Sequence, residues 1–245
     1  MPVSPNGSVA KHDRADFAQE FLRRNRAYRA GWERLGDSDL RSVAALAEAY
    51  RWGLSVLFDP DLPVRAYPAI WRSDAASQIV SLAPAPADLP GAAPLPEVRI
   101  VAAWVTADAS EIVLDRDGVR HRFRVAGTGA RTPLTILLPP LGDTLRVSAC
   151  DAARRMVGGL SVAEAASAMR PSRLQQQRLA LLLRVLDAWL AGASNREIGA
   201  RIVYPWLAGT DAAAWKGSAE RRRVQRLIGE ARMLADRGFR MLLKP

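Results

Sequence analysis

The sequence is poor in the residues that catalytic and metal sites use most. It contains one cysteine, Cys150, and two histidines, His12 and His121. Both histidines are far from any cluster of Asp, Glu or Cys at a spacing typical of metal ligands. There is no glycine-rich phosphate loop and no triad-like set of residues. We therefore expect that the chain is no enzyme and has no catalytic residue, no metal and no cofactor.

Long apolar runs are also missing. No run reaches the roughly 18 residues that a membrane helix needs, and Met1 to Ala10 lack the charged start and apolar middle of a secretory signal. A single cysteine excludes an intramolecular disulfide, so Cys150 is expected to be a small buried side chain. These absences favour a protein of the reducing cytoplasm with no membrane partner.

Lysine is scarce, although the chain is basic. Of 35 Lys and Arg residues only Lys11, Lys216 and Lys244 are lysines. Arginine binds phosphate and guanine with two parallel hydrogen bonds, but a GC-rich genome produces the same bias. The charge is also uneven, because residues 151–245 contain 17 Lys+Arg and 8 Asp+Glu and so carry +9 of the total +10. This asymmetry indicates a polyanionic partner for the C-terminal part.

The first half of the chain predicts helices followed by a sheet. Helices are expected over residues 13–50, with a break at Gly36-Asp37, because aromatic residues recur there at helical spacing, namely Phe17, Phe21, Tyr28 and Trp32. The arginines between them are expected on the outer face of this helix. Residues 83–96 contain five prolines and predict a loop. Short alternating runs near 98–138, two of them joined by Asp117-Gly118, predict a small antiparallel sheet.

The second half predicts only helices. Residues 173–191 form the most apolar segment, which we expect to be a central buried helix with Gly192 as its C-terminal stop. Pro139-Pro140 marks the predicted boundary between residues 1–140, a regulatory or interaction domain, and residues 141–245, a helical DNA-binding domain. The expected fold class is α+β, with N-terminal helices, a small antiparallel sheet and an all-α C-terminal domain.

The last fifty residues have the pattern of a helix-turn-helix with an extended turn. Ser194 and Glu197 have the spacing of a capping box and predict a helix through Val203. The turn over residues 204–217 is longer than the usual three or four residues, and Pro205, Trp206 and Trp215 are expected to pack it down. Ser218 can cap the final helix.

A helical wheel divides this final helix into two faces. The inward face is apolar and consists of Val224, Leu227, Ile228, Ala231 and Ala235. The opposite face is basic in its N-terminal half, where a recognition helix contacts base edges. Arg to guanine and Gln to adenine are the expected pairings. The candidate DNA-binding residues, including those of the preceding helix and turn, are Arg196, Arg201, Lys216, Arg221, Arg222, Arg223, Gln225 and Arg226.

These motifs resemble those of a known family. The stretches that carry the resemblance are Glu20 to Tyr28 with Trp32, Tyr50 to Leu54, Ile70 to Arg72, Asp187 to Ile198, Arg222 to Leu227 and Gly238 to Leu243. In this order they resemble FseA-type transcriptional activators, which occur on proteobacterial integrative and conjugative elements. Gly199 departs from the family, in which alanine is more usual.

The resemblance implies a sequence-specific activator of excision and conjugative-transfer genes. It implies a C-terminal domain with an extended-turn helix-turn-helix that binds double-stranded promoter DNA, and an N-terminal domain whose partner is an antiactivator protein. RNA polymerase is the other expected partner of the N-terminal domain. Three alternatives stay open from the residues alone: a replication or partition protein that binds DNA, a protein-interaction module of the antiactivator kind, and a basic helix face that is merely solvated.

Overall fold

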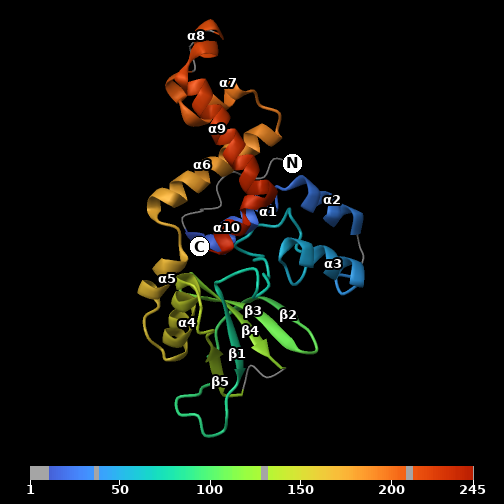
Figure 1. Ribbon diagram of the computed structural model, residues 1–245, viewed down its shortest axis with the longest axis vertical. Coiled ribbons are helices and arrows are strands. Elements are labelled where there is room, and N and C mark those ends of the chain that lie inside the picture. Colours follow the sequence, from blue (N-terminus) through green and yellow to red (C-terminus); the bar gives the residue numbers. More distant parts are fainter. Residues whose placement is uncertain (1–10, 36–38, 128–131, 208–211, 245) are drawn as a thin grey trace.

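The computed structural model describes residues 11–35, 39–127, 132–207 and 212–244. The α+β fold class is confirmed, and Figure 1 shows an elongated molecule with the sheet at one end and α8 at the other. The N-terminal helices are α1 (Arg14–Leu22), α2 (Arg26–Leu35) and α3 (Val43–Trp52). The strands are β1 (Ile79–Pro84), β2 (Ile100–Val105), β3 (Ala109–Arg116), β4 (Val119–Ala126) and β5 (Leu134–Leu137). The later α-helices are α4 (Thr144–Val157), α5 (Ala163–Met169), α6 (Arg173–Leu190), α7 (Asn195–Ile198), α8 (Ala212–Gly217), α9 (Ala219–Met233) and α10 (Arg240–Leu243).

The first predicted helix is divided in two at residues 23–25. The Asn25 side chain accepts a hydrogen bond from the Tyr28 amide at 2.9 Å and so starts α2. Its amide group donates to the carbonyls of Ala235 and Asp236 at 2.9 and 3.1 Å. The prediction of one continuous helix is therefore wrong, because α1 ends at Leu22 and Asn25 begins a second helix while also binding the C-terminal part of the chain.

The sheet is mixed, which corrects the predicted antiparallel sheet. Its strand order is β2-β3-β4-β1-β5, and β1 runs parallel to β4 while the other neighbours are antiparallel. β1 precedes and overlaps the proline-rich segment that predicted a loop. The β3–β4 hairpin is confirmed, since Asp117 and Gly118 have φ of 55° and 76°, as a tight hairpin turn requires.

The chain builds two hydrophobic cores that do not follow the order of the sequence. One contains side chains of α1–α3, of the segment 54–79 and of α6–α10. The other lies between one face of the sheet and the helices α4 and α5. The boundary at 140–141 stays a prediction, but packing crosses it in both directions: α1 packs on C-terminal helices, and α4 packs on β1 and β4.

The other face of β4 is buried against α1 through charged side chains. Arg120 lies 2.5 Å from Asp16, and Arg122 pairs with Asp13 and lies 2.9 Å from Asp16. Burial and the neighbouring Asp13 raise the pKa of Asp16. Burial would also raise the pKa of Asp13, but the charge and hydrogen bond of Arg122, the hydrogen bond from the Asp16 amide and the charge of Arg120 together lower it. Polar and apolar residues alternate along β4, and α1 with its N-cap Asp13 buries Arg120 and Arg122 of the polar face.

α1 is also joined to α6 by ion pairs. The Arg24 guanidinium lies 2.5 Å from both Glu20 and Asp187. Burial alone would raise the pKa of Glu20, but His12, Arg24 and Arg23 together lower it to about 2. Arg23 and Arg24 are thus not on an outer face, which corrects the sequence-based expectation for these arginines.

The C-terminal tail completes the first core. Phe239 is fully buried, with its ring centroid 6.5 Å from that of Trp52 and 6.1 Å from that of Trp71. The Ser77 amide donates to the carbonyl of Leu243 at 2.9 Å. Trp52 and Trp71 are both buried, and Leu54 forms a β-bridge with Trp71. No helix in the described ranges is long and apolar enough to cross a membrane.

Candidate DNA-binding surface

α6 and α9 form the scaffold of the basic end of the molecule. The predicted central helix is confirmed as α6, whose buried side chains are Leu179, Leu182, Leu183, Val185 and Leu186. The inward face of α9 is also confirmed, because Val224, Leu227, Ile228 and Ala231 are buried there. Arg178 on α6 and Glu230 on α9 form a salt bridge of 2.6 Å beside this contact. The rotation of α9 about its axis is therefore set by its apolar face.

The helix before the turn begins as predicted but continues differently. Ser194 and Glu197 form the capping box: the Glu197 amide donates to Ser194 at 3.3 Å, and the Ser194 amide donates to Glu197 at 2.8 Å. After α7 the chain continues as a π-helix, Gly199–Val203, where a regular helix was expected. A Cβ at Gly199 would lie 2.6 Å from Cη2 of Trp215. Glycine at this position is thus explained by the close approach of the indole ring.

The extended turn has two short helices and two tryptophans with opposite environments. A 3-10 helix, Pro205–Leu207, precedes α8, and residues 208–211 lie outside the described part. Trp215 is 7% exposed, so its predicted packing role is confirmed. Trp206 is 74% exposed and contacts the Tyr204 ring at 5.2 Å, so its predicted packing role is wrong. An exposed indole beside the basic helix is a feature that the sequence analysis missed.

The start of α9 is built from local hydrogen bonds. Ser218 caps the helix as predicted, accepting from the Arg221 amide at 3.1 Å and donating to the carbonyl of Trp215 at 3.0 Å. The Arg221 guanidinium donates to the carbonyl of Lys216 at 2.9 Å and is only half-exposed. This arginine therefore also holds α8 against α9.

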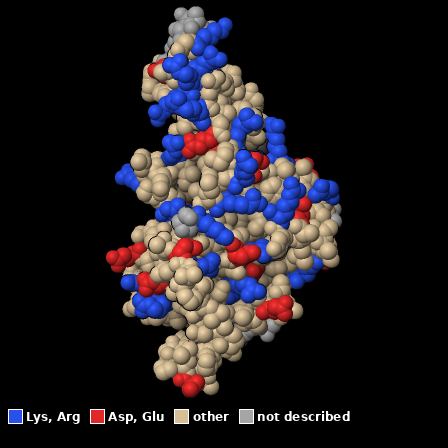
Figure 2. Space-filling model, in the orientation of Figure 1, with Lys and Arg blue, Asp and Glu red and all other residues tan. Residues whose placement is uncertain are grey.

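The eight candidate residues lie on three neighbouring elements. We call them the basic surface: Arg196, Arg201, Lys216, Arg221, Arg222, Arg223, Gln225 and Arg226. They come from α7 with its π-helix, from α8 and from α9, which contact one another. All except Arg221 are exposed. Figure 2 shows Lys and Arg gathered at this end of the molecule, over the start of α9.

The cations of α9 are available for an external anion. Within the described residues, no carboxylate oxygen lies within 4.0 Å of the guanidinium of Arg222, Arg223 or Arg226. The buried apolar face on the other side of α9 keeps these side chains pointing to solvent. A guanidinium in this setting can bind two phosphate oxygens or the N7 and O6 atoms of guanine. Which residue does which stays a prediction.

The side chains of nucleophilic or metal-binding type are buried elsewhere. Burial, with the charges of Arg116 and Arg122, lowers the pKa of His121 to about 4, and its ring stacks on Phe123. Cys150 is buried in the second core, and burial raises the pKa of its thiol. The described residues contain no group of three or more His, Cys, Asp or Glu placed to hold a metal ion.

Two family models match this chain. Residues 131–244 match a model described as "T6SS, Transcription factor, DNA binding domain", and residues 6–56 match a model described as "Proteobacterial transcriptional regulator-like domain". Comparison with curated proteins and with solved structures gives no match. The first model covers every residue of the basic surface, so the matches and the exposed arginines support one class of protein, a transcription regulator that binds DNA. The second match indicates more narrowly a regulator of the proteobacterial type.

Proposed function

We propose that the chain is a sequence-specific transcriptional activator that inserts the N-terminal half of α9 into the major groove of promoter DNA. In this proposal Arg222, Gln225 and Arg226 contact base edges. The flanking and preceding cations bind phosphates and set the position of α9 on the duplex, namely Arg196, Arg201, Lys216, Arg221 and Arg223. The major groove of B-DNA is wide enough to admit a helix of this kind.

The observation that carries the proposal is the division of α9 into two faces. Val224 and Leu227 are buried against the rest of the helical core, while Arg222, Gln225 and Arg226 on the other face are exposed. The guanidiniums of Arg222 and Arg226 also have no carboxylate oxygen within 4.0 Å among the described residues. A solvated helix face with no partner would not need its arginines to be kept apart from carboxylates in this way. The N-terminus of a helix also carries a partial positive charge. Phosphate is therefore attracted to this end of α9 both by the exposed arginines and by the helix dipole.

The regulated genes follow from the resemblance to FseA-type activators. We propose excision and conjugative-transfer genes of a mobile element as the targets, with an antiactivator protein or RNA polymerase bound by the N-terminal part. A second candidate is a set of type VI secretion genes, since the family description matched by residues 131–244 refers to that system. A genome-wide map of bound DNA separates the two, because the sites would lie upstream of transfer genes or of secretion genes.

The test of DNA binding removes two charges from the exposed face of α9. Arg222→Ala with Arg226→Ala should abolish the mobility shift of promoter DNA while far-UV circular dichroism stays unchanged. The matched control is Arg34→Ala with Arg154→Ala, which removes two exposed arginines from α2 and α4.

The control variant should bind like the wild type. A normal mobility shift by the α9 double variant would overturn the assignment of α9 as the recognition helix. Binding by the wild type that is weak and insensitive to salt would instead support a protein-interaction module, because phosphate contacts make DNA binding steeply dependent on salt.

A further inference from the structure

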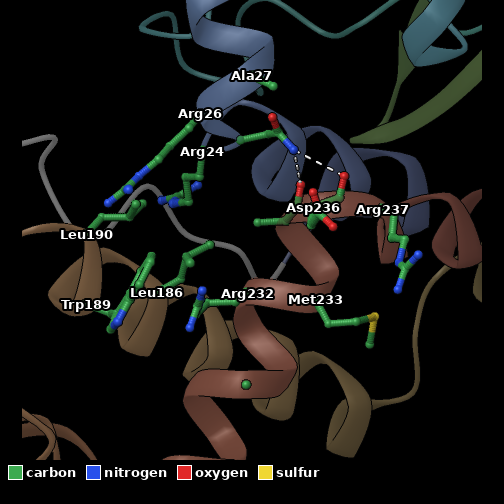
Figure 3. A pocket seen from close by; sticks show the side chains of 13 residues that line it. Arg24, Arg26, Ala27, Leu186, Trp189, Leu190, Arg232, Met233, Asp236 and Arg237 are labelled. Carbon is green, nitrogen blue, oxygen red and sulfur yellow. Dashed lines mark hydrogen bonds between the residues drawn. The ribbon is translucent and has the colours of Figure 1, made fainter.

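A cavity of about 530 Å³ lies between the N-terminal helices and the C-terminal half of α9. Its walls come from the α1–α2 junction, from the last turn of α6, and from the end of α9 with the π-helix Leu234–Gly238 that follows it. Figure 3 shows side chains from these elements directed into the space between them. The volume falls within the roughly 300–1,000 Å³ of pockets that bind small molecules, and the DNA-binding surface proposed above lies at the other end of α9.

One side of the cavity is apolar. Leu186 is buried, and Trp189 and Leu190 are half-buried on the same end of α6. On α9 the cavity is lined by Gly229, where an added Cβ would meet no atom within 4 Å. Glycine is unfavourable inside a helix. No neighbouring atom among the described residues requires glycine at this position, and the space beside it is open.

The polar side of the cavity is cationic. Arg24 is neutralised, because it pairs with Asp187 at 2.5 Å and with Glu20 at 2.5 Å. Arg26 and Arg232 are different: their guanidinium carbons lie 5.2 and 4.4 Å from the centroid of the Trp189 ring.

Neither of these two guanidiniums, nor that of Arg237 in the same lining, has a carboxylate oxygen within 4.0 Å among the described residues. The lining contains one carboxylate, that of Asp236. The cavity therefore holds an excess of positive charge beside an apolar wall. A cation above an aromatic face keeps its N–H groups free to donate at its edge.

We propose that this cavity binds an amphipathic organic acid. Its carboxylate accepts hydrogen bonds from Arg26 and Arg232, and its apolar body lies against Trp189 and Leu190 in the space over Gly229. A phosphate of DNA would satisfy the arginines but has no apolar group to fill this wall. Since the cavity walls belong to both α2 and α9, a bound acid stabilises the contact between the N-terminal helices and the helix that carries the basic surface.

The test is isothermal titration calorimetry of the full chain with 2-naphthoate as the probe. The neutral 2-naphthalenemethanol, which has the same ring system, tests the need for the carboxylate. Arg26→Met with Arg232→Met removes the charge and keeps apolar bulk, whereas Gly229→Leu fills the cavity. Arg184→Met is the control, since this exposed arginine of α6 is not part of the cavity lining. Far-UV circular dichroism verifies that each variant is folded.

We expect saturable binding of one 2-naphthoate per chain. Hydrogen bonds between charged groups are stronger than neutral ones, so affinity should fall at least about tenfold in the double arginine variant and for the neutral alcohol. Gly229→Leu should abolish binding, and Arg184→Met should bind like the wild type. Absence of heat with the folded wild type, equal binding of the alcohol, or unchanged binding by Gly229→Leu would each overturn the proposal. DNA takes no part in this assay, so its outcome is independent of the proposed function.

Discussion

Two glycines of the C-terminal helical region should respond in opposite ways to the same substitution. Gly199 lies in the π-helix that follows α7 in the chain, and Gly229 lies within α9. In a helix, replacing glycine by alanine stabilises by about 1 kcal/mol from propensity alone. A Cβ at Gly229 meets nothing within 4 Å, so Gly229→Ala should stabilise the protein by about this amount.

At Gly199 the methyl group meets a rigid ring. It would lie 2.6 Å from Cη2 and 3.2 Å from Cζ3 of Trp215, which is 7% exposed and has little room to move. Overpacking of this kind costs about 1–3 kcal/mol. The gain in helix propensity is common to both variants, so the steric cost is the difference between them. Gly199→Ala should therefore be about 1–3 kcal/mol less stable than Gly229→Ala.

The assay is urea unfolding followed by far-UV circular dichroism, with the free energy of unfolding extrapolated to water. Trp215→Leu supplies the matched background, because it removes the ring atoms that Gly199→Ala would meet. In that background Gly199→Ala should lose its steric cost, and a double-mutant cycle measures the coupling. Equal stability of Gly199→Ala and Gly229→Ala in the background that keeps Trp215, or no coupling in the cycle, would refute the reasoning.

The remaining predictions concern pH and the first core. Burial lowers the pKa of His121 from its ordinary value of 6.5 to about 4 in the folded protein. The neutral imidazole therefore contributes about 3 kcal/mol to the free energy of unfolding above pH 6.5, and this contribution is lost as the pH falls to 4. His121→Phe should remove this slope from urea titrations at stepped pH, and a persisting slope would contradict the assignment. Glu20, with a pKa lowered from 4.5 to about 2, should add a loss of similar size as the pH falls from 4.5 to 2, which Glu20→Gln removes and His121→Phe leaves intact. Phe239→Ala should destabilise by about 3–5 kcal/mol, whereas Trp206→Ala should change the unfolding free energy by less than about 0.5 kcal/mol; similar values for the two would show that the tail is not part of the first core.

Local signals in the sequence predicted most of the candidate site. The capping box of Ser194, the cap of Ser218 and the two faces of α9 each depend on residues a few positions apart, and the structure has all three. The same holds for the hairpin turn at Asp117-Gly118. Such features are predictable because helix caps, tight turns and helical periodicity are set by neighbours along the chain.

Contacts between distant segments were decided only by the tertiary structure. The parallel pairing of β1 with β4 joins residues some forty positions apart, and the strand pattern does not identify its neighbour. Arg120 and Arg122 of β4 are buried because the start of α1 supplies Asp13 and Asp16, a hundred residues earlier. An alternation of polar and apolar residues shows that a strand has two faces, but it does not show whether solvent or a charged helix covers the polar one.

The two tryptophans of the extended turn show the difference between what the sequence predicts and what the tertiary structure decides. Sequence alone determined that the turn is long, aromatic and placed before a capped basic helix. It did not distinguish Trp215, which is buried against Gly199, from Trp206, which is exposed. The physical reason is that burial depends on a complementary space in a partner element. That space exists only after α7, its π-helix and α9 have packed together.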